Sequence, residues 1–120
     1  MPEMNSRVVL VVEDQALIGL SIEAFLIEAG YAVAGPFASN SEALDWLAEG
    51  RPAAAVIDLG LKDGLSTRLG EELRRRGIGF VVYSGHAQRP DLAPELHDAP
   101  WLRKPVPRED LLRAVEALAA

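Results

Sequence analysis

The chain has 120 residues, which is enough for one domain with a sizeable hydrophobic core. Hydrophobic residues make up 49% of it and charged residues 25%, the balance of an ordinary globular protein rather than of a disordered or fibrous one. The net charge of -6 opposes nonspecific binding to nucleic acid or to anionic lipid, and the absence of cysteine excludes disulfides and thiolate metal sites.

The first six residues are polar and acidic. Residues 1–6 lack the basic start, the apolar core and the small-residue cleavage site of a secretory signal peptide. No apolar run approaches the length of about 18 residues that crosses a bilayer. We therefore expect a cytoplasmic protein with a disordered leader at 1–6, one domain over 7–120 and no output domain.

Apolar runs alternate with amphipathic stretches, a pattern typical of a parallel sheet covered by helices on both faces. Strands are predicted at residues 7–12, 32–35, 53–58, 79–84 and 101–103. Helices are predicted at 15–29, from Ser41 to a stop at Gly50, along Leu65, Leu69 and Leu73, and along Leu111, Val115 and Leu118. Three prolines in and just after 88–99 leave room there for only a short or poorly ordered fourth helix.

Polar residues follow several of these strands at their carboxyl ends. Glu13 and Asp14 end the first, Asp58 the third, Ser84 the fourth and Lys104 the fifth. In a doubly wound sheet of order 2-1-3-4-5 the first and third strands are neighbours, so the three carboxylates would share one crevice. They would repel one another unless a cation neutralised them, and Mg²⁺ or Mn²⁺ suits such a set of oxygen ligands.

Asp58 stands apart from the other two acids because it follows a small, apolar run. A carboxylate at a rigid strand end beside a dication can attack phosphorus and form an aspartyl phosphate. Ser84 could then donate its hydroxyl to one phosphate oxygen, and Lys104 could pair with another. Gly85, directly after Ser84, leaves space for the phosphoryl group.

In the order and spacing of these residues the chain resembles a bacterial response-regulator receiver domain over residues 7–120. The resemblance implies a flavodoxin-like doubly wound sheet and a stand-alone signalling switch rather than an enzyme. It implies that Asp58 is the phosphoacceptor and that Lys104 pairs with the phosphate. It also implies that the backbone carbonyl of Gly60 joins Glu13, Asp14 and Asp58 as a metal ligand.

Further roles follow from the same resemblance. Ser84 would be the switch hydroxyl, Trp101 the aromatic switch residue, and the peptide bond before Pro105 would be cis. Gly60 and His86 occupy positions that tune dephosphorylation. The segment at Ser84 is similar to the subgroup of receivers with a Phe-Ala-Thr-Gly signature at the fourth strand.

The loop after Asp58 departs from the family's usual pattern. Lys62 stands where relatives have a proline, and Asp63-Gly64 comes two residues early.

The implied partners are a histidine kinase or phosphotransfer protein as phosphoryl donor and an unidentified downstream protein. A phosphate sink and a phosphorylation-independent scaffold are the alternatives within the family. A phosphohydrolase of the haloacid-dehalogenase type would need a general acid two residues after the nucleophile, where Gly60 stands. A flavodoxin-type cofactor site is disfavoured because Glu13 and Asp14 would repel a phosphate.

Overall fold

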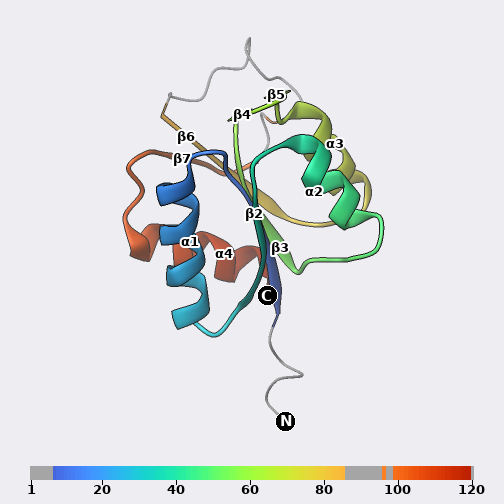
Figure 1. Cartoon of the computed structure of the whole chain (residues 1–120). Helices are drawn as coiled ribbons and strands as arrows, with labels where there is room; N and C mark the ends of the chain where they lie inside the picture. Colours follow the sequence, from blue (N-terminus) through green and yellow to red (C-terminus); the bar gives the residue numbers. More distant parts are fainter. Residues whose placement is uncertain (1–6, 86–95, 97–98, 120) are drawn as a thin grey trace.

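The computed structural model describes residues 7–85, 96 and 99–119. Five parallel strands form one sheet in the order β2-β1-β3-β6-β7, with β3 next to β1 at its centre (Figure 1). These strands are β1 (Val8–Val12), β2 (Ala32–Phe37), β3 (Ala54–Asp58), β6 (Phe80–Ser84) and β7 (Trp101–Arg103). The order corresponds to 2-1-3-4-5, so the predicted flavodoxin-like fold is confirmed.

Helices cover both faces of the sheet. On one face lie α1 (Ala16–Glu28) and α4 (Arg108–Ala119), and on the other lie α2 (Asn40–Leu47) and α3 (Thr67–Arg75) (Figure 1). No helix of the described residues is long and apolar enough to span a bilayer.

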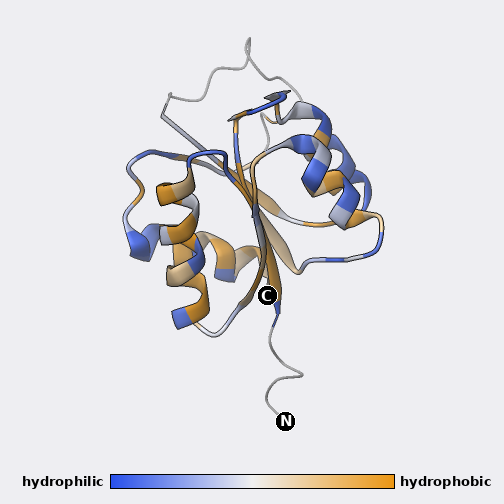
Figure 2. Cartoon of the chain, in the orientation of Figure 1, coloured by the Kyte–Doolittle hydropathy of each residue, from blue (hydrophilic) through white to orange (hydrophobic). Residues whose placement is uncertain are grey.

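The core consists of two apolar layers, one on each face of the sheet. Alternate side chains of a strand point to opposite faces. Leu10 and Val12 therefore pack on the side of α2 and α3, whereas Val9 and Val11 pack on the side of α1 and α4. Because central parallel strands are buried on both faces, β1 is apolar along its whole length and β3 is apolar up to Asp58; the centre of the sheet is accordingly coloured largely orange in Figure 2.

The edge strand β2 runs two residues beyond the predicted end at Gly35. The pairing of β1 with β2 shifts register between Leu10 and Val12, and Gly35 has a φ of 106°. A Cβ atom at Gly35 would lie 2.5 Å from the carbonyl oxygen of Val11, so this bend requires glycine. Beyond it, the Glu13 backbone N–H donates to the Phe37 carbonyl at 2.8 Å, which anchors the residue that follows β1.

The helix that we predicted along Leu65, Leu69 and Leu73 begins only at Thr67. Leu65 lies instead in a small antiparallel hairpin formed by β4 (Gly60–Leu61) and β5 (Gly64–Leu65). Gly64, with a φ of 125°, makes the turn possible. The hairpin occupies the segment in which the sequence departs from the usual receiver pattern. Of the predicted fourth helix at 88–99, only Leu96 and Ala99 are among the described residues.

Candidate metal and phosphoacceptor site

Three polar side chains stand in one row across the centre of the sheet. Val12 of β1 pairs with Ile57 of β3, so the following residues, Glu13 and Asp58, end their strands side by side. Asp58 pairs in turn with Tyr83 of β6. Strand alternation turns all three side chains toward the face that α1 and α4 cover.

The carboxylates of Glu13, Asp14 and Asp58 form one cluster. One oxygen of each lies within 4.8 Å of the others. Glu13 and Asp58 are buried, at 3% and 7% exposure, whereas Asp14 is exposed to solvent. Two buried carboxylates and an accessible third suit a hard dication that keeps part of its water shell, so the donor set fits Mg²⁺ or Mn²⁺.

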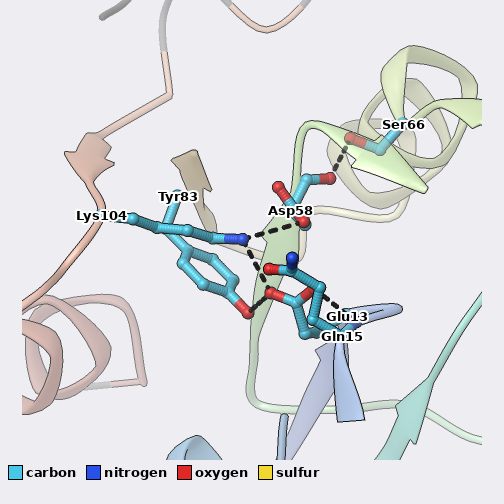
Figure 3. A network of polar contacts seen from close by, with 6 residues as sticks. All are labelled: Glu13, Gln15, Asp58, Ser66, Tyr83 and Lys104. Atoms are coloured by element: carbon cyan, nitrogen blue, oxygen red, sulfur yellow. Dashed lines mark hydrogen bonds and ion pairs between the residues drawn. The ribbon is translucent and has the colours of Figure 1, made fainter. Parts of the chain in front are cut away.

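Lys104 joins the two buried carboxylates from the end of β7. Its Nζ donates to Glu13 Oε1 at 3.0 Å and to Asp58 Oδ2 at 3.1 Å (Figure 3). The ammonium group also lies 4.8 Å from the centre of the Tyr83 ring. A backbone bond from the Lys104 N–H to the Ser84 carbonyl, 2.7 Å long, holds the start of this side chain. The peptide bond from Lys104 to Pro105 is cis.

Tyr83 contributes to the site, and the sequence analysis missed it. Its hydroxyl donates to Glu13 Oε1, while the Gln15 backbone N–H donates to Glu13 Oε2 at 2.8 Å. Figure 3 shows the ring reaching toward Glu13 beneath the Lys104 side chain. The available signal was a hydroxyl-bearing aromatic residue in an otherwise hydrophobic buried strand, since such a group needs a partner.

Ser66 was also missed. It is fully buried, and its Oγ donates to the Asp58 carbonyl oxygen at 2.7 Å. Its backbone N–H donates to the Leu59 carbonyl at 2.8 Å. Ser66 thereby joins the beginning of α3 to the end of β3, which supports the backbone of the candidate phosphoacceptor.

The pKa shifts reflect burial and these contacts. Burial raises the pKa of Asp58 to about 6; the Glu13 charge adds to the rise and Lys104 opposes it. Burial also acts to raise the pKa of Glu13, but hydrogen bonds from Tyr83, the Gln15 backbone and Lys104 outweigh it and lower this pKa. The pKa of Lys104 is raised, because its bonds to both carboxylates outweigh the effect of burial. With a pKa of about 6, Asp58 is mostly ionised at neutral pH.

A cavity of about 430 Å³ opens beside the row of carboxylates. Its lining includes Asp14, Asp58, Gly60, Ser84 and Lys104, so five of the residues predicted from the sequence meet at one opening. Glu13 is not part of this lining. Ser84, the last residue of β6, is 2% exposed.

Trp101, another residue predicted from the sequence, is not part of this lining. Trp101, the first residue of β7, is half-buried and packs against the apolar layer on the side of α2 and α3. His86 lies outside the described residues.

Asp63 links the hairpin after β3 to the amino-terminus of α2. Its Oδ1 accepts from the Asn40 backbone N–H at 2.8 Å, and its Oδ2 accepts from the Ser41 backbone N–H at 3.1 Å. The Asn40 side chain donates to the Gly64 and Leu65 carbonyls at 3.3 and 3.1 Å. These bonds hold the segment that begins at Gly60.

Comparison with known proteins agrees with this geometry. The family model described as "Response regulator receiver domain" matches residues 9–116. The transcriptional regulatory protein PdtaR of Mycobacterium tuberculosis is 31% identical over 115 residues, which cover 92% of this chain and 55% of that protein. The chain thus spans about half the length of the curated relatives it matches.

Solved structures share the fold. A response regulator receiver protein from Sinorhizobium medicae has a TM-score of 0.86 at 23% identity, with 97% of this chain and 96% of that one covered. A CheY-like receiver domain protein from Methanospirillum hungatei has a TM-score of 0.83 at 26% identity, with 94% and 93% covered. The matched family model, which covers most of the chain, shows that this protein belongs to the response regulator receiver domains.

Proposed function

We propose that the chain is a phosphorylation-controlled signalling switch in which Asp58 accepts a phosphoryl group. The observation that carries this proposal is the position of Lys104, whose ammonium group bonds both Glu13 and Asp58 beside a cavity that also exposes Asp14. This arrangement combines a nucleophile, a cation site and a phosphate-pairing amine in one opening. A histidine kinase or a phosphotransfer protein is the donor that such a receiver would use.

In the transfer, a carboxylate oxygen of Asp58 forms a bond to the phosphorus of the donor's phosphohistidine as the phosphorus–nitrogen bond breaks. The electron pair of that bond stays with the leaving imidazole. Lys104 pairs with a phosphoryl oxygen, and the Ser84 hydroxyl, at the end of the neighbouring strand, donates to another. Glu13, Asp14, Asp58 and the Gly60 carbonyl would hold a Mg²⁺ ion, which would supply positive charge to offset the charge of the carboxylates and the phosphoryl oxygens.

Phosphorylation would act as a switch only if the phosphoryl group favours one of two conformations of the domain. Ser84 and Trp101 are the candidates for this response, because they occupy the switch positions implied by the resemblance to receiver domains; they lie at opposite ends of the paired segments of β6 and β7. Gly60 and His86 are the positions that we propose to influence the lifetime of the phosphoryl group.

The test is phosphorylation by acetyl phosphate with Mg²⁺, followed by intact-protein mass spectrometry. We expect one phosphoryl group on the wild type, none on Asp58→Ala, and wild-type uptake on the control Asp110→Asn, which alters an exposed aspartate in α4. Equal labelling of the wild type and Asp58→Ala would refute the assignment.

Two other uses of the same fold make different predictions. A phosphate sink would be phosphorylated without any change in its affinity for a protein partner. A scaffold that does not depend on phosphorylation would bind its partner equally well as wild type and as Asp58→Ala. Once a partner is known, its affinity for the phosphorylated, unphosphorylated and Asp58→Ala proteins separates the three possibilities.

A further inference from the structure

Tyr83 has a polar group that the proposed phosphoryl transfer does not use. The side chain is 2% exposed and packs in the apolar layer between the sheet and helices α1 and α4. Burying a hydroxyl costs free energy unless it is hydrogen-bonded, and this hydroxyl donates to Glu13 Oε1. A phenylalanine would fill the same apolar space, so packing alone does not explain the hydroxyl.

The contact crosses an intervening strand. Glu13 directly follows β1, Tyr83 is the next-to-last residue of β6, and Asp58 of β3 lies between them. Neighbouring strands are about 4.8 Å apart, so the two backbones are separated by roughly 10 Å. A long side chain with a polar tip can bridge that distance, whereas an aliphatic residue at position 83 offers no donor.

We propose that Tyr83 is a positioning residue of the metal site, whose hydroxyl holds the carboxylate of Glu13 in its orientation toward the cation. Three donors fix this carboxylate: Tyr83 and Lys104 at Oε1, and the Gln15 backbone N–H at Oε2. The Glu13 side chain is fully buried, so water has little access to replace a lost donor.

The tyrosine matters most when Lys104 moves. The inference rests here on the proposed function, in which Lys104 pairs with a phosphoryl oxygen on Asp58. In that state the ammonium group gives up part of its contact with Glu13 Oε1, and the Tyr83 hydroxyl is the donor that stays on this oxygen. Glu13 thus keeps its place, and the cation keeps its ligand, while Lys104 changes partner.

The first test compares Mg²⁺ affinity by isothermal titration calorimetry. We expect Tyr83→Phe to raise the dissociation constant about tenfold, as is usual when a hydrogen bond to a metal ligand is removed. The matched control is Tyr31→Phe, which removes the chain's other tyrosine hydroxyl just before β2, at the far end of the sheet. A wild-type dissociation constant for Tyr83→Phe would overturn the proposal.

A second measurement uses the wild-type protein and does not depend on the variant folding. With ¹³C-labelled tyrosine, the Cζ resonance of Tyr83 should shift during a Mg²⁺ titration, because the cation draws charge from Glu13, and the Tyr31 resonance should stay in place. A Tyr83 resonance that does not move while Mg²⁺ binds would contradict the positioning role.

These results are independent of the test of the proposed function. If Tyr83→Phe weakens Mg²⁺ binding but the wild type takes up no phosphoryl group, the phosphoacceptor proposal fails and the role of Tyr83 stands. If the wild type is phosphorylated and Tyr83→Phe binds Mg²⁺ normally, the phosphoacceptor proposal stands and the proposed role of Tyr83 fails.

Discussion

The Ser66 hydroxyl donates a 2.7 Å hydrogen bond to the backbone carbonyl of Asp58. Ser66 immediately precedes α3, and Asp58 is the last residue of β3. The two residues are eight positions apart, and the hairpin of β4 and β5 occupies the chain between them. Ser66 therefore closes the loop that carries Gly60 and keeps the backbone of Asp58 in register with its neighbours.

Ser66→Ala should lower the free energy of unfolding by about 1–3 kcal/mol, because the buried Asp58 carbonyl loses its donor. Urea denaturation without Mg²⁺ measures the change. The control Ser21→Ala, at an exposed position of α1, should change stability by less than about 0.5 kcal/mol. Equal stability of Ser66→Ala and the wild type would mean that this bond does not hold the loop.

Asp58→Asn should stabilise the cation-free protein at pH 8. In the wild type, the pKa of Asp58 in the folded state is about 6, above the ordinary value of 3.8. The folded protein therefore keeps a proton at a pH where the unfolded chain has lost it, and wild-type stability falls as pH rises through 6. The neutral amide avoids this loss, with a gain of about 1–3 kcal/mol at pH 8 that shrinks toward pH 5. A gain independent of pH would show that burial of the Asp58 charge is not its cause.

Lys104→Met should raise Mg²⁺ affinity while lowering phosphorylation at saturating Mg²⁺. The substitution removes a positive charge 3.0 and 3.1 Å from two carboxylates, so their attraction for a dication increases several-fold. The phosphoryl group, in contrast, loses its pairing amine. Calorimetry and acetyl phosphate labelling measure the two effects.

The matched control for this variant is Lys62→Met. Lys62 is the other lysine of the chain, is exposed and lies in the hairpin turn, so the net charge changes equally. If both variants bind Mg²⁺ alike, a general charge effect rather than the position of Lys104 is responsible.

Asp63→Ala should lower the midpoint of urea unfolding at pH 7, because the amino-terminus of α2 loses two backbone hydrogen bonds. Those bonds, the one from Asn40 first, hold the pKa of Asp63 below its usual value of 3.8. The stabilisation is therefore complete above about pH 4 and disappears as pH falls through the lower folded-state pKa. Urea curves at pH 7 and below pH 3 measure this.

For Asp63 the control is Glu116→Ala, which removes an exposed acid from α4. If the urea midpoint of Asp63→Ala is still below that of the wild type at the lowest pH, the ionised carboxylate is not the source of the difference.

The local sequence was sufficient to predict the sheet and most of the residues at its edge. The apolar runs at β1 and β3 indicate strands buried on both faces, and parallel strands bring their carboxyl ends to one edge whatever the details of packing. Glu13, Asp58 and Lys104 consequently meet as predicted from their positions after strands. The predictions of the end of β2 and of the start of α3 were wrong, because Gly35 and Gly64 allow bends that side-chain periodicity does not indicate.

Which donor reaches which acceptor depended on the tertiary structure. Tyr83 and Glu13 are 70 positions apart, and their contact requires the register of three strands together with the length of a tyrosine side chain. The Ser66 bond to Asp58 requires the hairpin between them to close, and the Asp63 bonds require α2 to lie beside that hairpin. Hydrogen bonds need partners placed to within a fraction of an ångström. The sequence alone determined which residues come to the edge of the sheet, and only the packed fold decided how they are held there.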